Sequence, residues 1–558
     1  MASGGKRFNL KPPFDSVETR LPVEALISEE KYKLQRDLFL QGFANVQQKK
    51  FDDPGSFYAV AGIHGLPDGY CQHGTILFPT WHRAYVSLLE MLIYNEAKSI
   101  VDSYPDCDKK KEYKNELKKV RFPYWDWASP SVLCQGIPSV LFQELIDVET
   151  LQEADDEGVV EVTITIRNPL RAYTLPQDLG ILKLVGDTSN PTQRPYIPDE
   201  RTYPYTPVGY ATVRHPDKDY LSDVNSTGLD IITSCSSTFR PSVWHLFKSV
   251  TEWKYFSNHS SEAEKQTEEY MTYSSIEGVH DIVHIKIGGT GGHMSYVETA
   301  GFDPIFFLHH ANVDRLTAIW QACYPNSWMI GDGKRDENTS LEPFYNEDKG
   351  RYWNSKDIRK VKDLKYTYPE LKETDPVTLL EDMLTYYQPI PNPVPTSHIY
   401  KVSISVKKKN YINTSFEIRA FIDLPDSSAS TPVTSPHFAG SMSIFARDGT
   451  TPCATCDENS GKFVNGNIDI TTCMQRLRLI NENNKKEWGP YNPDKPENDG
   501  KTLQDRITLI SVLMDGSKIS NKRTGLKEAH SWQLRINKDD ENAGPIEHKK
   551  LGPIQIKH

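Results

Sequence analysis

Two histidine-bearing blocks between Ser275 and Arg315 constrain this chain more than any other feature of its sequence. His280 and His284 stand four residues apart in SIEGVHDIVH, so on a helix their side chains share one face about one turn apart. Glu277 falls on the same face. In the second block, FDPIFFLHHANVDR, an adjacent pair of histidines begins an apolar helical run. One member of that pair can complete a three-histidine metal site.

A second group of histidines lies far upstream. His64, His73 and His82 fall within nineteen positions, and Pro79 with helical apolar spacing places His82 in the first turn of a long helix. A lone histidine is more often a structural residue than a ligand. Three of them upstream of another cluster indicate a second metal site.

The donor types narrow the choice of metal. Imidazole suits zinc, copper, iron and nickel. A zinc peptidase requires HExxH, whereas this chain has HDIVH. A ferritin-like di-iron site requires two Glu-x-x-His motifs, and only the one formed by Glu277 and His280 is present. Two nitrogen-rich sites favour copper and dioxygen chemistry instead.

Five motifs in one order resemble the type 3 copper proteins, which are the tyrosinases, catechol oxidases and molluscan haemocyanins. They are GIHGLP, CQHGTILFPTWHRAY, RFPYWDW, HDIVH and FDPIFFLHHANVDR. The resemblance spans roughly residues 10 to 385 and is closest to fungal tyrosinases. It implies a mainly α core, a helical bundle carrying a binuclear copper site. It also implies dioxygen as co-substrate, with phenolic small molecules hydroxylated to o-diphenols and oxidised to o-quinones.

The resemblance further implies which side chains bind the metal. The first copper is assigned to His64, His73 and His82, and the second to His280, His284 and His310. In this family the second histidine of the adjacent pair is the ligand, so His309 becomes a neighbour that supports the site. Asp314 and Asp303 are carboxylates available to orient an imidazole, with helix-end or turn stabilisation as the alternative.

Further site residues follow from the same likeness. Cys71 stands where fungal and molluscan members form a thioether to the ring of His73, and a buried thiol is the alternative. Glu277 matches the family glutamate that holds a water near the second copper, a plausible proton relay.

The substrate side of the site carries one departure from the family pattern. Asp281 replaces the asparagine that tyrosinases often have beside the first ligand of the second copper. Its carboxylate either adds basicity at the water near the second copper or repels a phenolate substrate. Val297 and Phe306 correspond to residues lining the substrate entrance.

After Tyr387 the hydrophobic period changes from helical to two. We expect a catalytic domain over 1–387, a Pro-rich cleavable linker over 388–397 and an all-β sandwich or barrel over 398–558. The likeness implies that this last domain keeps the enzyme latent until an activating protease cuts the linker. Phe445, or its rival Phe438, is a candidate plug of the copper entrance, and ordinary strand packing is the alternative.

Cys453 and Cys456 form a C-x-x-C motif, which places two soft ligands at a spacing that can bind Cu(I). The resemblance to fungal pro-tyrosinases with similar motifs implies that this pair delivers copper to the core. A zinc or disulfide clip with Cys473, or two inert thiols, are the alternatives.

Composition excludes several classes of function. A net charge of −11 lacks the basic footprint of a nucleic-acid-binding protein. No apolar run is long enough for a membrane span, and the N-terminus lacks a signal-peptide core, so we expect a cytoplasmic location. Catechol oxidase activity without hydroxylation, or a haemocyanin-like oxygen carrier, are the alternatives to a tyrosinase.

Overall fold

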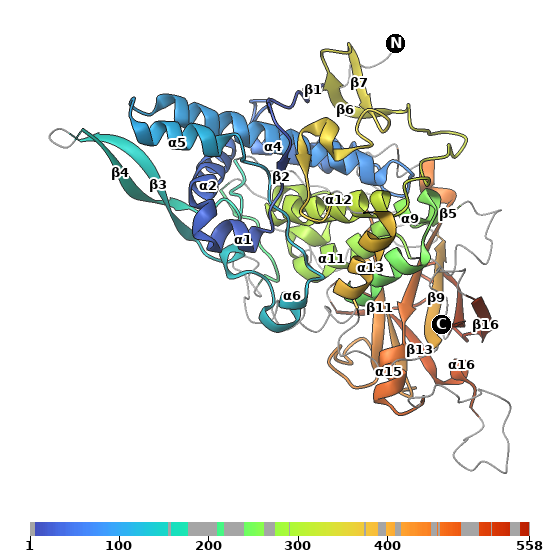
Figure 1. The fold of residues 1–558 in the computed structure, drawn as a ribbon. Helices are drawn as coiled ribbons and strands as arrows, with labels where there is room; N and C mark the ends of the chain where they lie inside the picture. Colours follow the sequence, from blue (N-terminus) through green and yellow to red (C-terminus); the bar gives the residue numbers. More distant parts are fainter. Residues whose placement is uncertain are drawn as a thin grey trace, which may run out of the picture.

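The computed structural model describes residues 6–154, 158–176, 209–216, 239–261, 274–289, 291–372, 375–388, 398–407, 415–447, 455, 458–480, 501–514, 516–535 and 547–556. Helices dominate the part before the Pro-rich segment, and strands dominate the part after it (Figure 1). The expected helical core followed by a β region is therefore confirmed. Only Gln388 of the expected linker lies among the described residues.

The longest helix, α4 (Phe78–Ser103), packs against α2 (Lys33–Gln48) and α12 (Ile305–Cys323) in the middle of the core. Pro79 lies in its first turn, where the missing N–H removes no helical hydrogen bond. The other principal core helices are α1 (Val23–Ser28), α3 (Phe57–His64), α5 (Asp108–Leu117), α6 (Pro130–Gln135), α9 (Trp253–Ser257), α11 (Ile276–Gly288) and α13 (Pro376–Tyr386).

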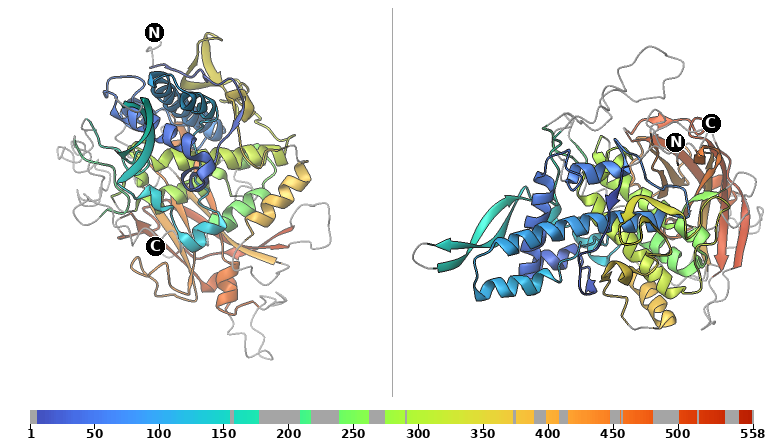
Figure 2. Two further views of the ribbon diagram at one scale, coloured as in Figure 1. Left: turned by 60° about the vertical axis from the view of Figure 1, so that its left-hand side comes forward. Right: turned by 90° about the horizontal axis from the view of Figure 1, so that it is seen from above.

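A two-stranded hairpin, β3 (Leu145–Ala154) and β4 (Gly158–Arg167), projects from the core at the end opposite to the C-terminal sheets (Figure 2). Near the N-terminus, β1 (Phe8–Asn9) pairs with β6 (Ser340–Asn346), which pairs with β7 (Arg351–Asn354). A further small sheet joins β2 (Glu18–Thr19) to β8 (Tyr366–Thr367).

The C-terminal region is a sandwich of two sheets. One has the order β11-β10-β13-β14, and the other has the order β16-β15-β9-β12-β5. Alternate residues of β9 and β10, from Tyr400 to Val406 and from Phe416 to Ile422, point into one shared apolar cluster. The strands of this region are β9 (His398–Lys407), β10 (Phe416–Ile422), β11 (Phe438–Ile444), β12 (Phe463–Asp469), β13 (Ile507–Leu513), β14 (Lys518–Ile519), β15 (Leu526–Arg535) and β16 (Glu547–Pro553).

The sandwich is joined to the core by a strand that the core itself supplies. β5 (Ser260–Ser261) lies beyond α9 and pairs antiparallel with β12. Helix α11, which carries His280 and His284, lies against β11. The histidine region of the core therefore faces the C-terminal sheets directly.

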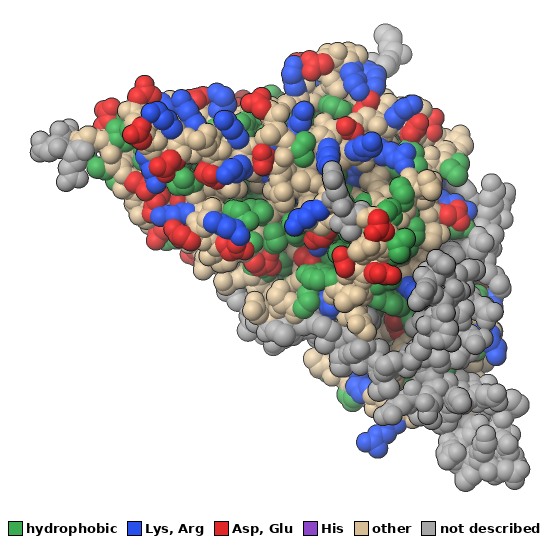
Figure 3. Space-filling model, viewed as in Figure 1, with side chains coloured by type: hydrophobic (Ala, Val, Ile, Leu, Met, Phe, Trp, Pro, Cys, Tyr) green, Lys and Arg blue, Asp and Glu red, His purple; other side chains and the backbone are tan. Residues whose placement is uncertain are grey.

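Basic and acidic side chains are interspersed over the face of the molecule shown in Figure 3. Among the described helices, none combines the length and apolar character required to cross a bilayer.

Candidate metal centre

The first histidine group comes from three successive pieces of the core. His64 ends α3, His73 lies in the following loop, and His82 lies in the first turns of α4. Their ring centroids are 5.1 to 5.6 Å apart. Gly65 is required beside His64, because a Cβ there would approach the backbone oxygen of Glu298 to 2.2 Å.

The second group is carried by α11 and α12. The ring of His280 lies 4.4 Å from that of His284 and 4.8 Å from that of His310. The Nε2 atoms of His284 and His310 face each other at 3.3 Å. Ligand atoms of these three residues and of His309 all lie within 4.8 Å of one another. The helical spacing read from the sequence thus brings four imidazoles to one place.

The two groups face each other. The imidazole of His82 is stacked on that of His310 at 4.3 Å, and the ring of His73 lies 5.4 Å from that of His280. All six residues that the sequence analysis assigned as ligands are therefore gathered in one region.

The hydrogen bonds of several rings orient one nitrogen toward the centre. Nδ1–H of His82 donates to the Phe78 carbonyl at 2.8 Å, and Nδ1–H of His284 donates to the Met294 carbonyl at 2.9 Å. A carbonyl only accepts, so Nε2 of each ring keeps its lone pair. Among the described residues, the buried Nε2 atoms of His73, His82 and His280 have no hydrogen-bond partner. A metal ion would satisfy these buried acceptors, so the donor set fits imidazole-bound metal.

The electrostatic surroundings of the imidazoles also favour the neutral form that binds metal. Burial, together with the neighbouring imidazoles, lowers the pKa values of five rings, those of His73, His82, His284, His309 and His310, well below the usual range. The rings are therefore neutral at physiological pH, which is the form that binds metal.

His309 occupies a different side of the cluster from His310. Its ring is stacked on that of His280 at 5.1 Å and lies 6.0 Å from the indole of Trp127. His310 lies between the two histidine groups, whereas His309 borders only the second. This arrangement agrees with the assignment of His310 as the ligand, which stays a prediction.

The two carboxylates on α11 hold different parts of the site. Asp281 Oδ1 accepts a hydrogen bond from Nδ1 of His280 at 3.0 Å. Glu277 Oε1 accepts from the backbone N–H of Gly74 at 2.6 Å, beside His73. Burial alone would raise the pKa of Asp281, but His259 and His280 hold it below its ordinary value. Asp281 therefore contacts a histidine of the second group, whereas Glu277 contacts the backbone next to a histidine of the first group.

His259 is a site residue that the sequence did not reveal. It follows α9, is 9% exposed, and its Nδ1 lies 3.3 Å from Asp281 Oδ2. Its Nε2 lies 3.7 Å from Glu277 Oε2. No spacing rule links His259 to His280, so only the folded chain brings them together.

Asp314 and Asp303 have other partners than the imidazoles expected for them. Asp314 accepts hydrogen bonds from Arg83, Arg20 and the hydroxyls of Tyr366 and Tyr368. This network ties α12 to α4 and to the N-terminal segment.

Asp303 pairs through both oxygens with Arg214 and accepts the N–H of Ile305 at the start of α12. The helix-end alternative describes Asp303, which accepts an N–H at the start of α12. Asp314 lies inside α12 and faces guanidinium and tyrosine hydroxyl groups, which neither imidazole orientation nor helix-end stabilisation describes.

Val297 and Phe306 are enclosed rather than placed at an opening. The Val297 carbonyl lies 3.2 Å from Nδ1 of His64. Phe306 is fully buried, with its ring 4.8 Å from His64 and 4.1 Å from His310. Its ring therefore packs against one histidine of each group.

The C-terminal region covers the histidines with one aromatic ring. Phe445, just after β11, is stacked on His284 at 4.2 Å with 19° between the ring planes. Phe438 instead packs against Phe421 inside the C-terminal region, at 5.6 Å. Phe445 belongs to the apolar cluster of the core, so ordinary packing between strands does not describe it.

The cysteines of the chain lie in different surroundings. Cys71 is buried, and its Sγ lies within 4.8 Å of ligand nitrogens of His64 and His73. Cys453 and Cys456 lie outside the described residues. Cys473 is buried, and its Sγ contacts the carbonyls of Pro436 and His437.

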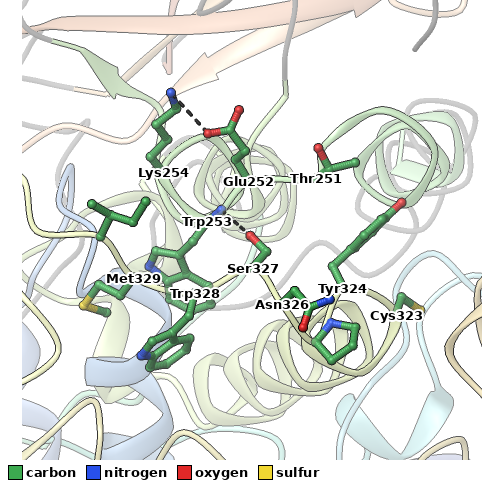
Figure 4. A pocket seen from close by; sticks show the side chains of 12 residues that line it. Thr251, Glu252, Trp253, Lys254, Cys323, Tyr324, Asn326, Ser327, Trp328 and Met329 are labelled. Atoms are coloured by element: carbon green, nitrogen blue, oxygen red, sulfur yellow. Dashed lines mark hydrogen bonds and ion pairs between the residues drawn. The ribbon is translucent and has the colours of Figure 1, made fainter. Parts of the chain in front are cut away.

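A surface pocket of about 600 Å³ lies beside the site, between α9 and the end of α12 (Figure 4). Trp253 and Trp328 line it, and the Trp253 indole donates a hydrogen bond to the carbonyl of Ile76. The pocket is thus linked to the loop after His73, but it does not contain the histidines.

The helical core, the facing histidine groups and the β sandwich over them define a class of protein in which a helical domain presents clustered imidazoles that can hold metal and a β domain lies over them. The family models agree: "Common central domain of tyrosinase" matches residues 54–323, and "Tyrosinase C-terminal domain" matches residues 400–495. The chain belongs to the tyrosinase family, whose members are copper-dependent and act on phenols.

Individual relatives are similar over much of the chain. Polyphenol oxidase 4 of Agaricus bisporus is 28% identical over 83% of this chain and 78% of its own length. A tyrosinase of Podospora anserina is 30% identical over 57% of this chain and 56% of its own length.

Solved structures share the fold. A recombinant mushroom tyrosinase is 24% identical with a TM-score of 0.72, covering 97% of this chain and 98% of its own. A mutant Aspergillus oryzae pro-tyrosinase is 20% identical with a TM-score of 0.75, covering 100% and 98%.

Proposed function

We propose that the chain is a latent tyrosinase. It hydroxylates monophenols at the ortho position and oxidises o-diphenols to o-quinones with dioxygen, once the C-terminal domain has moved away from two bound coppers. The observation that carries the proposal is the pair of facing three-histidine groups with Phe445 stacked on His284.

The histidines divide into two sets of ligands at such a site. His64, His73 and His82 would hold one copper, and His280, His284 and His310 the other. Bound copper supplies the activation of dioxygen and accepts the electrons of the diphenol. The chain orients the imidazoles, and the buried ring of Phe306 packs against His64 of one group and His310 of the other.

The phenol proton requires an acceptor within hydrogen-bond reach, directly or through one water. Glu277 already accepts backbone N–H groups of Gly74 and His259, but a carboxylate has about four acceptor positions. We assign the proton to Glu277, because both oxygens of Asp281 already face imidazoles.

Latency follows from the cover over His284. We propose a catalytic domain over 1–387, a linker over 388–397 that an activating protease cuts, and a shielding domain over 398–558. The likeness to a pro-tyrosinase fold supports this arrangement. While Phe445 is stacked on His284, a phenol ring cannot take that place.

We also propose a thioether between Cys71 Sγ and a carbon of the His73 ring. Forming it removes two hydrogens, with dioxygen as the oxidant. The burial of Cys71 and its closeness to the ligand nitrogens support it. Mass spectrometry would find the peptide that contains both Cys71 and His73 two hydrogens lighter than its sequence mass.

The test is an assay of copper-loaded protein, intact and after limited proteolysis, with tyrosine and with a catechol. A tyrosinase oxidises both after cleavage and neither before it. Oxidation of the catechol alone would identify a catechol oxidase, which is favoured by the engagement of Asp281 with His280 and His259. Oxidation of neither substrate, after cleavage and separation of the C-terminal domain, would overturn the proposal and favour the oxygen carrier.

A further inference from the structure

The segment around His259 connects the C-terminal sheets to both histidine groups. On one side, Asn465 of β12 donates its backbone N–H to the His259 carbonyl at 2.9 Å, and β12 continues by pairing with β5. On the other side, the imidazole lies between the carboxylates of Asp281 and Glu277. His259 therefore contacts the cover with its backbone and the site with its ring.

The two carboxylates carry this connection further. Asp281 bonds to Nδ1 of His280, which fixes the ring so that Nε2 points into the cluster. Glu277 accepts the N–H of Gly74 and, through its other oxygen, the N–H of His259 itself at 3.3 Å. The His259 ring thus lies against the carboxylate that bonds to His280, and the His259 backbone N–H bonds to the carboxylate that accepts the N–H beside His73.

A second contact from the C-terminal region reaches the same place. The Asn459 amide donates to the backbone carbonyl of His73 at 3.2 Å. The described C-terminal residues thus touch the histidine-bearing backbone at His73 and, through His259, at His280.

We propose that His259 is a positioning residue through which the docked C-terminal domain orients His280 for metal binding. The proposal rests on the copper site proposed above. It means that the sandwich does more than cover the histidines: it holds their supporting carboxylates in place. Copper binding and domain docking then strengthen each other, because coupling between two binding equilibria is reciprocal.

Copper retention by the full-length chain provides the first test. His259→Leu removes the donor facing Asp281 while keeping a similar volume, and His259→Asn keeps a donor at the place of Nδ1. Loss of a group that supports a metal ligand typically lowers metal affinity by about 10- to 100-fold. We expect copper transfer to an added chelator to be at least about tenfold faster for His259→Leu, with His259→Asn close to wild type.

His437→Leu is the matched control. This histidine lies in the C-terminal region, where its Nδ1 bonds to the Ile422 carbonyl, and its hydrogen bonds among the described residues stay within that region. We expect it to retain copper as the wild type does. Equal retention by wild type and His259→Leu would overturn the proposal. If His259→Leu does not fold, His259→Phe takes its place, because it also removes the donor but keeps a planar ring. Fast copper loss from His259→Phe, with copper retained by His437→Phe, supports the proposal, and retention equal to wild type overturns it.

Hydrogen exchange tests the coupling itself. Copper should slow exchange of the amides at 463–465 in the wild type, and this protection should disappear in His259→Leu. The amides of β10, which pair within the sandwich, serve as the internal reference. Protection that is the same in both proteins would refute the coupling. A wild type that binds no copper would refute the copper site proposed above, whereas copper binding without these effects would refute only the role of His259.

Discussion

The ion pair between Lys286 and Glu417 is the most informative single contact to break. Lys286 lies on α11, two residues after His284, and Glu417 lies on β10 of the sandwich. Their side chains are 7% and 4% exposed. Glu417→Gln would remove the charge and leave the buried ammonium group without its counter-ion.

The size of the effect can be worked from the pKa of Glu417. Burial alone would raise this pKa, but Lys286 and Arg419 lower it from 4.5 to about 2. At about 1.36 kcal/mol per pH unit, that difference corresponds to about 3 kcal/mol, in the range of about 3 to 5 kcal/mol for breaking a buried ion pair. The whole difference would raise the undocked fraction by about 300-fold, but Arg419 lies on the same strand as Glu417, so the share that concerns docking is smaller.

The assay is the initial rate of catechol oxidation by uncleaved, copper-loaded protein at pH 7. We expect Glu417→Gln to be up to about a hundredfold faster than wild type. The exposed carboxylate of Asp426 in the same domain provides the control, Asp426→Asn. Equal rates for all three uncleaved proteins, together with equal rates after proteolysis, would refute the claim that this ion pair holds the C-terminal domain over the histidines.

Four other changes test separate parts of the reasoning. Phe445→Ala should raise the rate of the uncleaved protein and leave the proteolysed rate unchanged; no increase would contradict the role of this ring as cover. Asp281→Asn should keep diphenol oxidation while changing the ratio of tyrosine to catechol rates, and an unchanged ratio would remove Asp281 from substrate choice. Asp314→Asn should lower the free energy of unfolding by about 3 to 5 kcal/mol in urea, because it leaves two buried guanidinium groups unbalanced. Burial lowers the pKa of His245, which pairs with Asp469 across the interface, from 6.5 to about 4, so acidification over that range should favour separation and speed hydrogen exchange in β12. Exchange independent of pH, after correction for the intrinsic rate, would contradict this last expectation.

The sequence predicted the elements that carry the histidines because local spacing determines them. His280 and His284 share a helix face whatever surrounds the helix, and Pro79 marks where α4 begins. The strands β9 and β10 could be predicted equally well, because alternation of apolar and polar residues requires only that one face of the strand is buried.

Partners distant in sequence could not be predicted in the same way. Asp314 lies one turn beyond His310, so an imidazole partner was reasonable, but Arg83 and Arg20 fill that side of α12. His259 has no periodic relation to Asp281, which it contacts. The choice between Phe445 and Phe438 depended on how β11 docks on the core, and strand alternation contains no information about docking.

The polar nature of the interface has a consequence for activation. Lys286 with Glu417 and Arg335 with Glu458 join the core to the sandwich as ion pairs, His245 with Asp469 joins them by a hydrogen bond, and Phe445 adds one aromatic contact. Cutting the linker breaks none of these contacts. It removes only the tether, which lowers the effective concentration of the cover near the site. Dissociation of the sandwich, rather than the cut itself, would therefore set the onset of activity, and conditions that weaken these ion pairs would replace the protease in part.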